Sequence, residues 1–172
     1  HRAQIAVRLL SWDPDEVIDE AFWARRIADA IARRAALAAD AGTTAYRLIY
    51  AEADRLPGLI VDRYGDFLVV QLLTLGVDHR RDLLVSILSE TLAPAGIYER
   101  SDVEVRSYEQ LESVTGLLWG EEPPTELEIV ENGHRFLVDL GGGQKTGFYL
   151  DQRRNRDILA GYAPGREMLD AF

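Results

Sequence analysis

The chain has 172 residues and is acidic, with 19 basic against 29 acidic side chains and a formal net charge of −10. Its hydrophobic share of 47% and charged share of 28% are typical of a globular protein and exclude disorder and collagen-like repeats. Cysteine is absent, so these residues supply no disulfide, thiolate metal ligand or thiol nucleophile. No apolar run is long enough to span a bilayer and the first residues lack the pattern of a secretory signal, so we expect a cytoplasmic protein outside the membrane.

The first third of the chain predicts a strand, a long helix and a second strand. Residues 4–10 alternate in part between polar and apolar side chains, which indicates a strand. From Asp19 to about Ala39 apolar residues recur at helical spacing, with acidic residues in the first turn, where the helix dipole favours them. Residues 45–51 alternate again and predict a strand.

The middle of the chain predicts a hairpin, a helix and another strand. Residues 59–63 and 67–73 are apolar and flank a short turn that contains Gly65, which indicates a hairpin. A helix capped by Asp78 follows and ends near Pro94, and residues 97–106 return to strand character. This order of elements indicates an α+β unit.

The last third predicts loops, a second hairpin, a helix and a strand. Residues 107–126 are rich in turn formers and predict loops. Residues 126–130 and 135–140 flank Asn132-Gly133, a pair that favours the positive φ angles of a type I′ turn. We expect a helix from Asp151, as its N-cap, to Tyr162, and an apolar strand that begins within residues 167–172.

Residues 141–150, called the glycine-rich turn below, hold Lys145, the single lysine among the 19 basic residues. A P-loop is excluded because Gln144 and Asp139 stand where that motif needs glycine, and a dinucleotide-binding loop is excluded because residues 146–150 separate the glycines from the helix. One interpretation is a ligand site, in which Lys145 and Arg153 pair with a carboxylate, Gln152 donates or accepts a hydrogen bond, and Phe148 or Tyr149 lies against a flat ring or a sulfonium. The other is a structural turn whose aromatic residues belong to the core, and the residues alone leave both open.

Three runs of sequence together resemble a known family. They are residues 56–65 (Leu-Pro-Gly-Leu-Ile-Val-Asp-Arg-Tyr-Gly), residues 97–102 with Val105-Arg106, and residues 145–153 (Lys-Thr-Gly-Phe-Tyr-Leu-Asp-Gln-Arg). In this order and at similar separations they resemble S-adenosylmethionine-dependent methyltransferases of large-subunit ribosomal RNA that form 5-methylcytosine. The resemblance covers nearly the whole chain.

The resemblance implies a division of the chain into four parts. Residues 1–14 would end a PUA-like domain and residues 15–41 would form a linker helix. Residues 43–140 would form a central strand-strand-helix-strand-strand domain with a hairpin after it, and residues 141–172 would hold the first helix and strand of a truncated Rossmann-like methyltransferase domain. The expected fold class is α+β, in a piece of a longer chain.

The resemblance also implies the ligands. S-adenosylmethionine would be bound in part by Lys145, Thr146, Gly147, Phe148, Tyr149, Gln152 and Arg153. Ribosomal RNA would be the substrate, with a homodimer as the expected assembly. Because a chain of charge −10 repels phosphate on average, only local arginines serve RNA, and those in the family-like strands are Arg63, Arg100 and Arg106.

We expect no catalytic residue within these 172 positions. Cytosine C5 becomes nucleophilic only after a thiolate adds at C6, and the chain has no cysteine, so this part alone would be inactive. No spacing typical of a metal site occurs. Two alternatives stay open, a non-catalytic module that binds RNA or protein, and a methyltransferase for another substrate.

Overall fold

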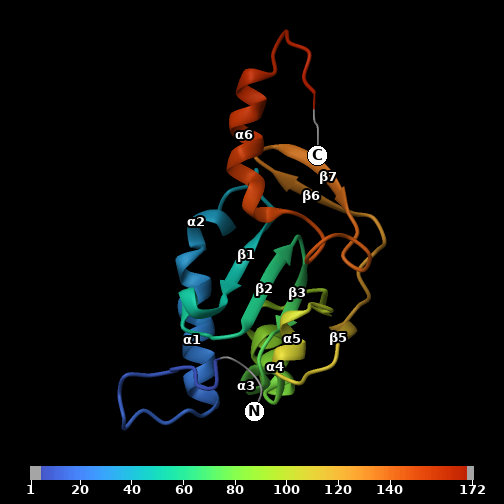
Figure 1. Ribbon diagram of the computed structural model, residues 1–172. Coiled ribbons are helices and arrows are strands. Elements are labelled where there is room, and N and C mark those ends of the chain that lie inside the picture. The colour runs from blue at the N-terminus through green and yellow to red at the C-terminus, as the bar shows by residue number, and fades with distance from the viewer. Residues whose placement is uncertain (1–4, 170–172) are drawn as a thin grey trace.

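The structure, a computed structural model, describes residues 5–169 (Figure 1). It is built on a five-stranded sheet. The strands lie in sequence order, and only the β3–β4 pair is parallel. A parallel pair needs a long crossover, and α4 with the short helix before it supplies that crossover. The strands are β1 (Ala45–Tyr50), β2 (Leu59–Tyr64), β3 (Phe67–Leu72), β4 (Gly96–Ser101) and β5 (Val114–Gly120).

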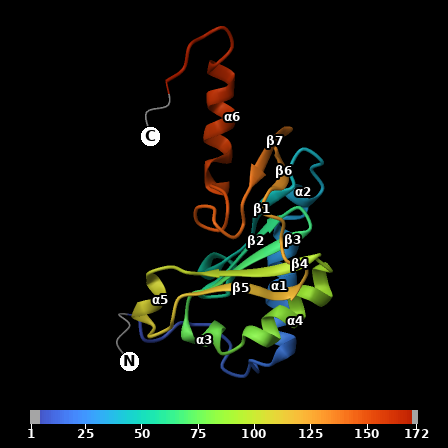
Figure 2. The ribbon, with the colours of Figure 1, turned by 90° about the vertical axis from the view of Figure 1, so that its right-hand side faces the viewer.

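Helices α1 and α4 cover one face of this sheet (Figure 2). Asp19 caps α1 by accepting a hydrogen bond from the amide of Phe22 at 2.9 Å. The helical segments are α1 (Glu20–Arg33), α2 (Ala35–Ala38), η1 (Ala51–Asp54), α3 (Leu75–Asp78), α4 (Arg81–Leu92), α5 (Val105–Tyr108), η2 (Leu150–Gln152) and α6 (Arg153–Tyr162). The predicted α+β class is confirmed.

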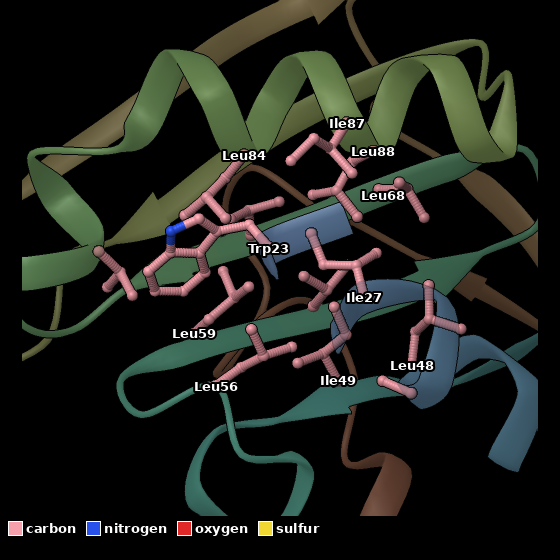
Figure 3. Packing of buried hydrophobic residues seen from close by; sticks show 14 of the residues in the cluster. Trp23, Ile27, Leu48, Ile49, Leu56, Leu59, Leu68, Leu84, Ile87 and Leu88 are labelled. Atoms are coloured by element: carbon pink, nitrogen blue, oxygen red, sulfur yellow. The ribbon is translucent and has the colours of Figure 1, made fainter. Parts of the chain in front are cut away.

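The main core lies between these two helices and the sheet (Figure 3). Trp23 and Ile27 project from α1, and Leu84 and Leu88 project from α4 toward Leu68 on β3 and its neighbours. Each of these side chains is at most 2% exposed. Burial of a large apolar side chain contributes roughly 1.5–3 kcal/mol, so this layer is the main source of stability.

A second, smaller core lies on the opposite face, under the hairpin of β6 (Leu127–Glu131) and β7 (His134–Val138). Ile129 and Val138 from the hairpin pack with Tyr64 and Val69 from the sheet. The hairpin turns at Asn132 and Gly133, whose φ angles are 50° and 78°, as the Asn-Gly pair predicts. The amide of Thr44 donates to the carbonyl of Val130 at 2.8 Å and joins the hairpin to the sheet.

Helix α6 extends away from the sheet beyond the hairpin (Figures 1 and 2). None of its residues is buried, and Ile158, Leu159 and Tyr162 are each about half exposed or more. The glycine-rich turn and η2 connect the hairpin to this helix and lie next to the sheet.

Several sequence predictions are wrong in detail. Residues 5–10 of the predicted first strand pair with no strand, and residues 102–106 do not continue β4, because α5 begins at Val105. Residues 114–120, predicted as loop, form β5, since pairing with β4 tolerates Gly116 and Gly120 at positive φ. Asp78 ends α3 and Asp151 lies in η2, so neither caps the helix that follows. Residues 167–169 form no strand, and the rest of that prediction lies outside the described residues.

Candidate functional site

The glycine-rich turn has a backbone that only particular residues adopt. Lys145 has a φ of 56° and Gly147 a φ of 132°. A Cβ atom at Gly147 would lie 2.7 Å from Cδ2 of Leu140, so glycine is required there for the angle and for the space. The amide of Gly147 donates to the carbonyl of Gln144 at 2.9 Å and closes the turn.

Thr146 anchors the turn to the sheet. Its side chain is 2% exposed, and its hydroxyl donates to the Asp62 carboxylate at 2.7 Å and lies 2.9 Å from the Tyr64 hydroxyl. Asp62 also accepts from Arg47 through Nε at 2.8 Å and Nη2 at 2.9 Å. Burial and the nearby Asp62 carboxylate raise the pKa of Tyr64, so its phenol stays protonated near neutral pH.

Arg100 anchors the turn a second time. Its guanidinium donates to the carbonyls of Leu140 at 2.7 Å and Gly143 at 3.0 Å, and it pairs with Asp102. Burial raises the pKa of Asp102, but the hydrogen bonds from Arg100 lower it by more than burial raises it. The pKa of Asp102 therefore lies below its ordinary value. The three runs of sequence that carry the family resemblance therefore meet at this turn.

A cavity of about 420 Å³ opens between β1 and the turn. Three cations, Arg47, Lys145 and Arg153, stand in its wall with one carboxylate, Asp151. The remaining wall is aliphatic or aromatic: Leu37, Ala45, Tyr46, Tyr50, Phe148 and Leu150. Each of the three cations is paired with a carboxylate of the chain, so their charges are balanced locally.

The wall residues are held from several sides. Lys145 pairs with Asp151 at 3.7 Å, and its Nζ lies 4.6 Å from the centre of the Tyr149 ring. Arg153 donates to Asn132 and to Thr43, each at 2.7 Å, which connects the start of α6 to the hairpin and to the sheet.

The structure places the predicted cofactor residues in three groups. Lys145, Phe148 and Arg153 stand in the cavity wall, whereas Thr146 and Gly147 shape the turn beneath it. Two others lie outside the wall. Tyr149 belongs to the turn, and its hydroxyl bonds to Gln144; Gln152 lies in η2, and its side-chain carbonyl accepts from Asn155 at 2.7 Å.

Sequence reasoning missed the sheet side of the site. Arg47, Tyr50 and Asp62 were not predicted as functional, although a charged residue inside the apolar strand of residues 59–63 was an available signal for Asp62. No local pattern marks Arg47 or Tyr50, because their place in the wall depends on the turn that lies across β1.

The three arginines predicted to contact RNA differ in exposure. Arg63 is half-buried and donates to the carbonyl of Gly65 at 2.8 Å. Arg100 is 6% exposed, and Arg106 is 2% exposed and donates to the carbonyls of Leu72 and Glu112 and to Asp78. The guanidinium groups of Arg100 and Arg106 therefore bind groups of the chain itself.

Within residues 5–169, no group of three or more His, Asp or Glu side chains could hold a metal ion. No helix in this part of the chain is long and apolar enough to cross a membrane.

A model of the S-adenosylmethionine-dependent methyltransferase family matches residues 56–172. The chain belongs to this family, which confirms the family resemblance.

Among curated relatives, "Ribosomal RNA large subunit methyltransferase I" of Shewanella amazonensis is 51% identical over 170 residues, and the protein of the same name from Photobacterium profundum is 47% identical over 171. Each alignment covers 99% of this chain and 43% of the relative, so the chain spans less than half the length of these relatives.

Two solved structures share the fold. One, described as "a putative sam-dependent methyltransferase from Streptococcus mutans", has a TM-score of 0.76 at 29% identity and covers 88% of this chain and 38% of that one. The other, "a putative methyltransferase complexed with SAH", has a TM-score of 0.73 at 30% identity and covers 86% and 37%.

The donor set of the cavity fits one end of S-adenosylmethionine. That end carries a carboxylate, an ammonium group and a sulfonium. Lys145 and Asp151 already form an ion pair in the wall, and a zwitterion presents the complementary pair of charges. The Phe148 ring packs against Phe136 of the smaller core and lies 4.4 Å from the Arg156 guanidinium, and its edge of the cavity wall is aromatic surface of the kind that attracts a cation such as a sulfonium.

Proposed function

We propose that the intact protein transfers a methyl group from S-adenosylmethionine to C5 of a cytosine in large-subunit ribosomal RNA. The observation that carries this proposal is the cavity beside the glycine-rich turn, whose wall holds an ion pair and aromatic rings suited to the methionine end of the cofactor. The family match and the ribosomal RNA methyltransferases among the relatives support the reaction class and the substrate.

In this proposal the chain supplies binding and orientation. Lys145 and Arg153 hold the carboxylate of the cofactor, Asp151 accepts from its ammonium group, and Phe148 lies near the sulfonium. S-adenosylmethionine, when bound, supplies an electrophilic methyl group. The nucleophile that activates cytosine comes from residues outside these 172, because the chain holds no cysteine.

The sheet side of the cavity is proposed to face RNA. Tyr50 is 53% exposed, and the Arg47 guanidinium lies 5.1 Å from the centre of its ring. An exposed ring beside a cation is the usual platform for an unstacked base and its phosphate. Arg63 is half-buried and is a further candidate for a phosphate contact.

The wider organisation follows the family. Residues 1–14 are proposed to end a PUA-like domain, residues 15–41 to form the linker, residues 43–140 the central domain and hairpin, and residues 141–172 the start of the catalytic domain. The exposed α6, which buries none of its residues here, is consistent with a helix that packs against further parts of such a domain. A cytoplasmic homodimer is part of the same proposal.

Calorimetry with S-adenosylmethionine tests the cofactor site in the intact protein. Lys145→Ala is expected to weaken binding about tenfold, the effect of losing one charge-assisted hydrogen bond. Arg135→Ala is the matched control, because Arg135 is a cation with a 76% exposed side chain on the hairpin, away from the cavity. Equal affinity in the wild type and Lys145→Ala would remove the site assignment.

Methylation of undermodified ribosomal RNA tests the reaction. The expected product is 5-methylcytosine, identified by mass spectrometry of the digested RNA. A methylated base other than cytosine would favour a methyltransferase for another substrate. RNA binding without cofactor binding would favour a non-catalytic module.

A further inference from the structure

We propose that Asp62 and Tyr64 of β2 are positioning residues, which hold the glycine-rich turn in the form that presents Lys145 and Phe148 to the cavity. The inference rests on the proposed function, because it gives β2, which has no residue in the cavity wall, a part in cofactor binding.

A directional chain of hydrogen bonds connects the turn to Asp62. The amide of Phe148 donates to the Tyr64 hydroxyl at 3.3 Å, and the Thr146 hydroxyl donates to Asp62 at 2.7 Å. A hydroxyl has one proton, so Thr146 accepts from Tyr64 across their 2.9 Å contact. The chain therefore runs from Phe148 through Tyr64 and Thr146 to the carboxylate, with every donor pointing the same way.

The chain ends at a carboxyl group on which several donors converge. Asp62 is fully buried, and it accepts from Nε and Nη2 of Arg47 as well as from Thr146, 84 positions further along the sequence. An asparagine offers one acceptor oxygen in place of two and adds donors where the site needs acceptors. Loss of the charge also leaves the guanidinium of Arg47 without its partner.

The turn depends on this support because its own backbone is unfavourable. Lys145, immediately before Thr146, has the left-handed φ of 56°, which a residue with a Cβ atom adopts at an energetic cost. Thr146 is buried and lies between the two wall residues nearest to it, Lys145 and Phe148. The hydrogen bonds from the sheet to Thr146 therefore determine the positions of the Lys145 and Phe148 side chains.

A matched pair of carboxylates separates positioning from general stability. Asp54 is 2% exposed and accepts two hydrogen bonds from Arg34, each at 2.6 Å, so it resembles Asp62 with Arg47. Asp54 joins η1 to α1 and accepts from the backbone amide of Tyr50, and among the described residues no hydrogen bond connects it to the turn, so Asp54→Asn is the control for Asp62→Asn. Tyr64→Phe removes one hydroxyl and keeps the buried ring.

Calorimetry of the intact protein measures the affinity for S-adenosylmethionine in each variant. Asp62→Asn and Tyr64→Phe are expected to weaken it about tenfold or more, since small misplacements of binding groups are costly. Asp54→Asn is expected to bind within about twofold of the wild type, the usual limit of coupling between separate sites. Thr146→Ser, which keeps the hydroxyl, is expected to bind more tightly than Thr146→Val.

Hydrogen exchange of the Phe148 amide is the second readout. Exchange should be faster in Asp62→Asn and Tyr64→Phe than in the wild type and unchanged in Asp54→Asn. Folded Asp62→Asn with wild-type affinity and exchange would overturn the inference, and so would an equal loss in Asp54→Asn. A wild-type protein that does not bind the cofactor would refute the proposed function, and the exchange comparison would still decide whether Asp62 and Tyr64 hold the turn.

Discussion

Arg106 provides a quantitative test of the buried arginines, because its side chain is 2% exposed and three groups of the chain accept its hydrogen bonds. We consider Arg106→Met, which keeps much of the length of the side chain and removes all its donors. The carbonyls of Leu72 and Glu112 lose the bonds from Arg106, and Asp78 keeps its bond from Arg81 at 2.8 Å.

The expected cost follows from these three bonds. An acceptor left unpaired in the interior costs about 1–3 kcal/mol, and breaking a buried charged pair costs about 3–5 kcal/mol. We expect the free energy of unfolding to fall by about 3–5 kcal/mol, which lowers the melting temperature by roughly 6–20 °C in a chain of this size.

Urea unfolding, monitored by circular dichroism, measures this change in the free energy of unfolding. RNA binding is measured without urea, at a temperature below the melting transition of the variant. Arg135→Met, at a 76% exposed side chain, is the control and should change stability by less than about 0.5 kcal/mol. A stable Arg106→Met protein that has lost affinity for RNA would refute the reasoning and restore the prediction of an RNA contact.

Three further predictions test the turn, a buried acid and the cavity wall. Gly147→Ala should abolish binding of S-adenosylmethionine measured by calorimetry, because a Cβ there would lie 2.7 Å from Leu140, whereas Gly161→Ala, with no atom within 4 Å, should bind normally. Burial raises the pKa of Asp54, but hydrogen bonds from Arg34 and the Tyr50 amide lower it by more, so the folded pKa lies below the unfolded one. The ionised carboxylate therefore contributes stability above the unfolded pKa of about 3.9, and this contribution is lost as the pH falls through the folded pKa. The difference in free energy of unfolding between the wild type and Asp54→Asn should accordingly narrow below about pH 4 in denaturant titrations, and a constant difference would contradict this. Tyr50→Ala should weaken RNA binding about tenfold in filter-binding assays through loss of stacking, whereas Tyr108→Ala, at a similarly exposed ring outside the cavity, should not.

The arrangement explains why the three family-like runs occur together. The first run contributes Asp62 and Tyr64, the second contributes Arg100, and the third contributes the turn that these residues bind. The runs are far apart in sequence, so their joint occurrence indicates a shared tertiary contact as well as shared ancestry. The same contacts place Lys145 and Phe148 in the cavity wall.

Local physical chemistry was sufficient for much of the fold. The Asn132-Gly133 hairpin, the helix that begins after Asp19 and the strands of residues 45–72 follow from positive φ preference, capping and periodicity, all of which act within a few residues. The sequence also indicated the family, and a family model that matches residues 56–172 supports it.

Tertiary structure alone decided three other matters. Strand β5 forms because β4 offers it a free edge, although its glycines favour a loop. Arg100 and Arg106 are buried because carbonyl oxygens from distant segments surround them. The cavity exists because the glycine-rich turn lies across β1. In each case the deciding partner is tens of residues away, and periodicity and propensity carry no information about which distant groups a side chain will meet.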